Sequence, residues 1–139
     1  MSNYDPDAAT AREDLCRFLS ACFYEPSEAF AEEHLFDSML TAATCLRPDL
    51  AAHARKLGEA FAAQDLETLL VDYTRLFLGP IDTLASPYGS QWTKAPAQTE
   101  DHLPLAVLEI YSEGGFETDA DFVDLPDHVA VELEFLYLL

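Results

Sequence analysis

Side chains that could bind a metal or carry out a reaction are present in this 139-residue chain, but they form no recognised catalytic pattern. The four histidines, His34, His53, His102 and His128, are scattered, without an HExxH spacing or a paired cysteine. There is no GxSxG turn for a serine nucleophile and no glycine-rich loop for a phosphate. We therefore predict no catalytic residue, no metal and no cofactor, and the sequence disfavours an enzyme.

The chain is strongly acidic, because 26 Asp and Glu residues against 7 Lys and Arg residues give a net charge of −19. Nucleic acids and anionic membrane surfaces both bind through clustered Lys and Arg, so the composition argues against either partner. Beyond Lys94 there is no Lys or Arg, while eleven acidic residues follow. This part of the chain is either a solvated acidic face or a docking surface for a cationic ligand.

The cysteines and the N-terminus bear on the cellular compartment. Cys16, Cys22 and Cys45 form an odd set without a CxxC pair, and we expect reduced, buried thiols as in a cytosolic protein. The segment 1–7 is polar and acidic, unlike a signal peptide, and no apolar run reaches the ~20 residues of a membrane span. The predicted location is the cytoplasm, without insertion into a membrane.

The spacing of apolar residues is helical along nearly the whole chain, with steps of three and four, and no segment alternates long enough to predict a strand. The expected fold is all-α: a single-domain bundle, residues 1–139, of about six helices with a long proline-rich loop at 79–102 and an acidic loop at 116–125. The predicted helices run from Asp5 to Pro26, from Ser27 to Pro48, from Pro48 to about Phe61, from about Asp65 to Leu78, from Leu103 to about Ser112, and from Pro126 onward.

The last predicted helix carries an apolar stripe that the other predicted helices do not cover. Val129, Leu133, Leu136 and Tyr137 share one face at helical spacing. An uncovered apolar patch of roughly a few hundred Å² is unusual on a monomer. We therefore expect either a chain that is C-terminally incomplete, whose further helices would cover the stripe, or a homodimer that exchanges its last helix.

Two regions combine aromatic, proline and polar residues in an ordered way. They are YTRLFLGP at 73–80 followed by SPYGS at 86–90, and LPDHVAVELEFL at 125–136. In the second region Pro126 suits an early helix position, Asp127 complements the helix dipole, and the dipole lowers the pKa of His128. Because these residues follow a loop, we expect the Asp127 and His128 side chains to be accessible. A well-capped core helix is the other interpretation of this region.

In this order on an acidic helical chain, YxxLFxGP, PYxS and PDHVxxELEFL resemble the TorD/DmsD/NarJ family of redox-enzyme maturation chaperones. The resemblance covers essentially the whole chain, although family members continue for several more helices. It implies a cytoplasmic chaperone that binds the twin-arginine signal peptide, or the apo catalytic subunit, of a molybdopterin oxidoreductase until cofactor insertion. By the same resemblance the peptide-binding residues are Tyr73, Leu76, Phe77, Pro126, Asp127 and His128.

The residues themselves also suit such a ligand, since a basic stretch followed by an apolar stretch needs acidic groups beside an apolar groove. Two other functions stay open. One is a stable assembly subunit of an oxidoreductase complex, which would remain bound to its partner. The other is an acidic hydrolase that uses Asp127 and His128 with Glu132, which lies four residues after His128 on the same helix face.

Overall fold

The computed structural model describes residues 5–79, 83–92 and 103–139, and within these ranges the chain is all-α, which confirms the predicted fold class. Tyr88 and His128 add an isolated antiparallel β-bridge. The elements are α1 (Ala8–Cys22), α2 (Ala29–Glu32), α3 (Leu35–Leu46), α4 (Pro48–Ala62), α5 (Leu66–Tyr73), the π-helical turn η1 (Thr74–Leu78), the 3₁₀ turn η2 (Gly89–Gln91), α6 (Leu103–Glu113) and α7 (Val129–Leu138).

No helix in the described ranges is both long enough and apolar enough to cross a membrane.

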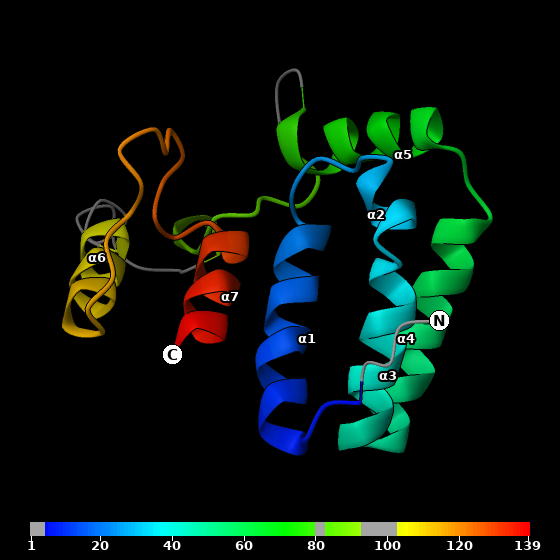
Figure 1. The fold of residues 1–139 in the computed structure, drawn as a ribbon. Coiled ribbons are helices and arrows are strands. Elements are labelled where there is room, and N and C mark those ends of the chain that lie inside the picture. Colours follow the sequence, from blue (N-terminus) through cyan, green and yellow to red (C-terminus); the bar gives the residue numbers. More distant parts are fainter. Residues whose placement is uncertain (1–4, 80–82, 93–102) are drawn as a thin grey trace.

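The hydrophobic core lies between α1, α3 and α4. Phe18 of α1 and Met39 of α3 are its large buried side chains, and Ala42 and Ala54 are buried beside them. Such small residues allow the helix axes to approach closely. Helix α7 packs along α1 on the side away from α3, so α1 is the central helix, and α5 lies across one end of the bundle (Figure 1).

Two helix starts are stabilised by Asp side chains that accept backbone N–H groups. Asp7 accepts the Thr10 N–H at 2.8 Å, and Asp65 accepts the Thr68 N–H at 2.8 Å. These hydrogen bonds favour the charged carboxylate and lower the pKa of both Asp7 and Asp65. The caps fix where α1 and α5 begin.

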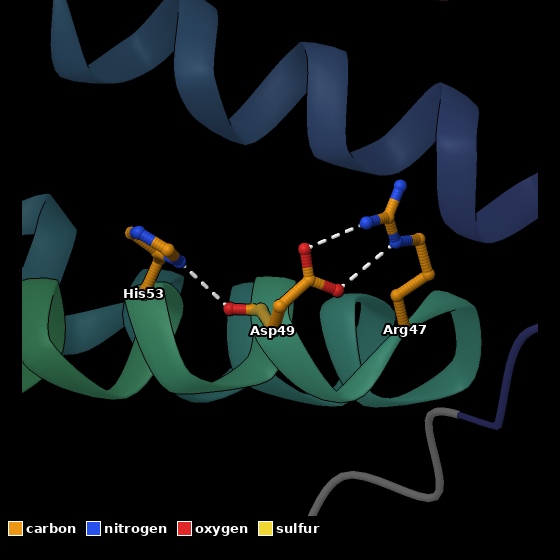
Figure 2. A network of polar contacts seen from close by, with 3 residues as sticks. All are labelled: Arg47, Asp49 and His53. Atoms are coloured by element: carbon orange, nitrogen blue, oxygen red, sulfur yellow. Dashed lines mark hydrogen bonds and ion pairs between the residues drawn. The ribbon is translucent and has the colours of Figure 1, made fainter.

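Helix α4 begins with a polar network that Figure 2 shows. Pro48 occupies its first turn, and the Arg47 guanidinium donates to both carboxylate oxygens of Asp49 at 2.9 and 2.8 Å. The Asp49 carbonyl oxygen lies 2.7 Å from Nδ1 of His53 one turn later. The hydrogen bonds from Arg47 lower the pKa of Asp49. Because these side chains are exposed, the network sets local geometry and adds little stability.

Three predicted boundaries are wrong, and each has a local cause. The first helix begins at Ala8, because Asp7 rather than Asp5 is the cap. The predicted second helix is divided into α2 and α3, because His34 adopts a left-handed conformation with φ 53°. The last helix begins at Val129 rather than at Pro126, because His128 caps it.

Apart from Glu132 and Glu134, the residues of helix α7 are apolar, so one stripe of its residues does not define a single buried face. Ala130 is buried against α1, where the Ser20 hydroxyl donates to its carbonyl oxygen at 2.6 Å. The Arg17 guanidinium lies 5.4 Å from the centre of the Tyr137 ring. Of the predicted bare stripe, Leu136 is 51% exposed, while its other three members are half-buried. The prediction of an entirely uncovered stripe is therefore wrong, since α1 covers part of it.

The three cysteines are free thiols. Cys16 and Cys22 are half-buried, and burial raises the pKa of Cys22 to about 11. Cys45 is exposed, contrary to the expectation of three buried thiols, and its Sγ donates to the Pro6 carbonyl oxygen at 3.3 Å. Cys45 lies on the outer face of α3, because Met39, Ala42 and Ala43 occupy the positions of that helix that face the core.

Candidate functional site

The first predicted group of site residues lies together at the end of α5 and in η1. Tyr73, Leu76 and Phe77 line one pocket of about 250 Å³, which we call the apolar pocket. Its other walls come from the end of α1, from α2 and α3, and from α4. They include Cys22, Pro26, Phe30, Phe36, Leu57 and Phe61. The lining is dominated by aromatic and aliphatic side chains, so the pocket suits an apolar ligand.

Aromatic packing fixes the wall of the apolar pocket that η1 forms. The Phe77 ring meets the Phe23 ring edge-on at 5.8 Å and the Tyr73 ring at 5.3 Å. The Tyr73 hydroxyl donates to the Phe23 carbonyl oxygen at 3.4 Å. The π-helical turn closes with a 2.7 Å hydrogen bond from the Gly79 N–H to the Thr74 carbonyl oxygen. Single π turns of this kind are frequent at functional sites.

The second predicted group, Pro126 to His128, lies before α7. Its residues form hydrogen bonds with η2 and with Tyr111 of α6. Asp127 is fully buried, and its Oδ2 accepts the Ser90 N–H at 2.8 Å. Its carbonyl oxygen accepts the Gly89 N–H at 3.0 Å. The Pro126 carbonyl oxygen accepts the Tyr111 hydroxyl at 2.8 Å. The expected accessible Asp127 is therefore wrong, because the carboxylate faces the backbone of η2.

His128 is also buried, with 6% of its surface exposed, contrary to the expectation of an accessible side chain. Its ring stacks on Tyr24 at 6.0 Å and meets the Tyr88 ring edge-on at 5.2 Å. Nδ1 accepts the Ala130 N–H at 3.1 Å, so the ring caps α7. Burial lowers the pKa of His128, although Asp124 and Asp127 oppose the shift. The pKa of His128 is lowered as predicted, but the cause is burial of the ring and not the helix dipole.

The burial of His128 predicts that acid destabilises the protein below about pH 6.5, the pKa of an unfolded histidine. The folded pKa is lowered, so the unfolded chain binds more protons as the pH falls from that value through the folded pKa. Urea unfolding at pH 7.5 and 5.5 measures the effect. His128→Asn keeps a capping side chain without titrating here, so its stability should fall less. An equal loss in both proteins would contradict the assignment.

The two predicted groups meet at the end of α1. Phe23 packs on Phe77, and the next residue, Tyr24, stacks on His128. Glu132, which the hydrolase alternative places beside His128, is half-buried, and burial together with the charge of Asp127 raises its pKa. Within the described residues no group of three or more His, Cys, Asp or Glu side chains could hold a metal ion.

Sequence reasoning missed a second pocket, of about 230 Å³, between α7 and the loop that follows α6. Aromatic rings form its walls, and carboxylates surround it, so we call it the acid-rimmed pocket. Among its lining residues are Tyr24, Phe116, Phe135, Glu117, Asp119 and Glu134. A signal was present in the sequence, because two aromatic residues, Phe116 and Phe122, lie in an acidic loop. Aromatic side chains in such a loop need a surface to pack on.

The fold and the two pockets define an all-α protein whose pockets present aromatic rings and carboxylates. A family model described as nitrate reductase delta subunit matches residues 43–139, so the chain belongs to the nitrate reductase delta subunit family. This confirms the resemblance to the TorD/DmsD/NarJ proteins that the sequence motifs predict.

A solved structure supports the same relationship. The crystal structure of a proposed redox enzyme maturation protein from Archaeoglobus fulgidus is 26% identical to the chain, with a TM-score of 0.58. The similarity covers 91% of this chain and 70% of that one. Among curated proteins, none matches the chain.

Proposed function

We propose that the protein is a maturation chaperone that binds an apolar segment of a redox-enzyme subunit through the apolar pocket. The preferred ligand is the twin-arginine signal peptide, or the apo catalytic subunit, of a molybdopterin oxidoreductase in the cytoplasm. The observation that carries the proposal is that Tyr73, Leu76 and Phe77, the first motif group, share one pocket. The family and the described role of the Archaeoglobus fulgidus protein support the same class of function.

The chemistry of the apolar pocket supports a peptide with an apolar core. Leu76 is 39% exposed, which leaves an aliphatic surface for a ligand to cover. Asp72 is the one acidic residue among the described residues that line the pocket, and the chain as a whole carries a net charge of −19. A basic segment next to the apolar core would therefore be attracted toward the protein before it binds.

The second motif group acts indirectly in this proposal. His128 contacts Tyr24 and Tyr88, and Asp127 holds η2 through Ser90. The Pro126 carbonyl oxygen holds Tyr111. Because Asp127 and His128 are buried, a peptide would contact the aromatic surface that they support. Their replacement would then weaken peptide binding by disturbing this surface.

Replacing Leu76 with glutamine tests the proposal. A polar group in the apolar pocket should weaken binding of a synthetic signal peptide about tenfold, because the ligand must then desolvate an amide. Leu78→Gln is the matched control, since Leu78 lies two residues further in η1, is 58% exposed and does not line the pocket. Isothermal titration calorimetry measures both affinities. Equal losses, or no loss for Leu76→Gln, would contradict the proposal.

The name of the family, which describes a subunit, favours one alternative. The protein would then be a stable assembly subunit that stays with its oxidoreductase after maturation. Affinity purification of the mature enzyme distinguishes the two functions. A chaperone is absent from the mature complex, whereas an assembly subunit is recovered in a fixed ratio.

A further inference from the structure

We propose that the acid-rimmed pocket binds an arginine side chain of the peptide whose apolar segment occupies the apolar pocket. This inference rests on the proposed function for the identity of the whole ligand. The pocket itself is a separate feature, formed by α7, the end of α6 and the loop at 116–122. Its occupant would set the orientation of the peptide on the protein.

The walls of the acid-rimmed pocket are built to receive a flat group. The Phe135 ring lies 4.7 Å from the Tyr111 ring and 5.8 Å from the Phe116 ring, where it forms an edge contact. The Phe116 N–H donates to the Tyr111 carbonyl oxygen at 2.9 Å, which fixes the start of the loop. Tyr24 completes the aromatic lining. A planar guanidinium stacks on such rings, whereas a compact ammonium does so less well.

The rim of this pocket supplies negative charge, and none of the ion pairs among the described residues involves it. Glu117, Asp119 and Glu134 line the pocket, and all three are exposed to solvent. The ion pairs formed by described residues lie at Asp14, Asp37, Asp49 and Asp72, so none of them involves the rim. No Lys or Arg follows Lys94 in the sequence. A cation from outside would therefore complement the rim.

Two further observations support the local negative potential. The carboxylates of Glu134 and Asp124 add to burial in raising the pKa of the Tyr24 hydroxyl. One oxygen of Asp119 accepts the Asp121 N–H at 2.8 Å, which holds this carboxylate at the turn of the loop. The Asp119 carboxylate is thus positioned by the loop before any ligand arrives, which lowers the cost of ordering it.

Two pairs of probes test the proposal on the full chain. The first pair is a synthetic signal peptide with arginine and the same peptide with citrulline, which keeps the shape and removes the charge. The second pair is N-butylguanidinium and N-butylurea, which need no apolar segment. The variant is Glu117→Gln with Glu134→Gln, and the control is Glu109→Gln with Glu113→Gln, on α6 and outside the pocket lining. Both double variants remove the same charge.

The arginine peptide should bind the rim variant about fivefold more weakly than the control, as expected for two partly screened carboxylates. The citrulline peptide should bind both variants equally. N-butylguanidinium should shift the resonances of Tyr24 and Phe116 in NMR spectra, and N-butylurea should not. Equal binding of both peptides to all proteins would overturn the inference. If neither peptide binds but N-butylguanidinium still does, the proposed function fails and the pocket assignment stands. Absence of any guanidinium effect overturns the assignment.

Discussion

Replacing Met39 by alanine is expected to lower the free energy of unfolding by about 2–5 kcal/mol, the range for a buried methionine truncated in a packed core. Met39 is 1% exposed, among the largest fully buried side chains described, and lies where α1, α3 and α4 meet. Alanine would leave a cavity there that the rigid helices fill only in part. Urea unfolding followed by circular dichroism measures the change.

Leu57→Ala provides the control for this prediction. Leu57 lies on α4, but 46% of it is exposed, so truncation removes little buried surface. Its cost should be below about 1 kcal/mol, as is usual for a residue outside the core. If both variants lost the same stability, the core would not be centred on the α1–α3–α4 contact.

Asp127→Ala should lower the free energy of unfolding by about 1–3 kcal/mol, because the buried Ser90 N–H would lose its acceptor. The effect should be strongest around η2, so the Ser90 amide should exchange with solvent faster than amides of α3. Hydrogen exchange followed by NMR tests this local release, and thermal melting tests the global cost.

Two further variants sharpen the test of Asp127. Asp127→Asn retains an oxygen that can accept the Ser90 N–H, so it should lose less stability than Asp127→Ala. Asp121→Ala removes a charge from the exposed part of the preceding loop and should change stability little. A loss in Asp127→Ala no larger than in Asp121→Ala would mean that the carboxylate does not anchor η2.

The main helices could be predicted because their apolar residues repeat locally. The Asp65 cap and the end of α5–η1 at Gly79 likewise depend on neighbours in sequence. The break between α2 and α3 at His34 could not be predicted, because no glycine or asparagine occupies this left-handed position. The π turn could not be predicted either, since a widened turn leaves the helical spacing of leucine and phenylalanine nearly unchanged.

The candidate site could be predicted only where it is local. Tyr73, Leu76 and Phe77 are neighbours, so their common pocket follows from one helix end. The burial of Asp127 depends on Ser90, 37 residues earlier, and no pattern near either residue signals that contact. The acid-rimmed pocket likewise needs Tyr24, which follows the end of α1, beside Phe135 from α7, and only the packing of α1 against α7 brings them together.

The consecutive residues Phe23 and Tyr24 have a consequence for how selective the protein can be. Phe23 packs on the wall of the apolar pocket and Tyr24 lines the acid-rimmed pocket, so the proposed binding mode has a single segment occupying both. Once its apolar part is bound, its arginine meets the second pocket at an effective concentration of about millimolar. Two contacts that are weak separately then give a much higher overall affinity. Abundant proteins that offer only an apolar stretch, or only a basic one, would gain neither this avidity nor a long residence time.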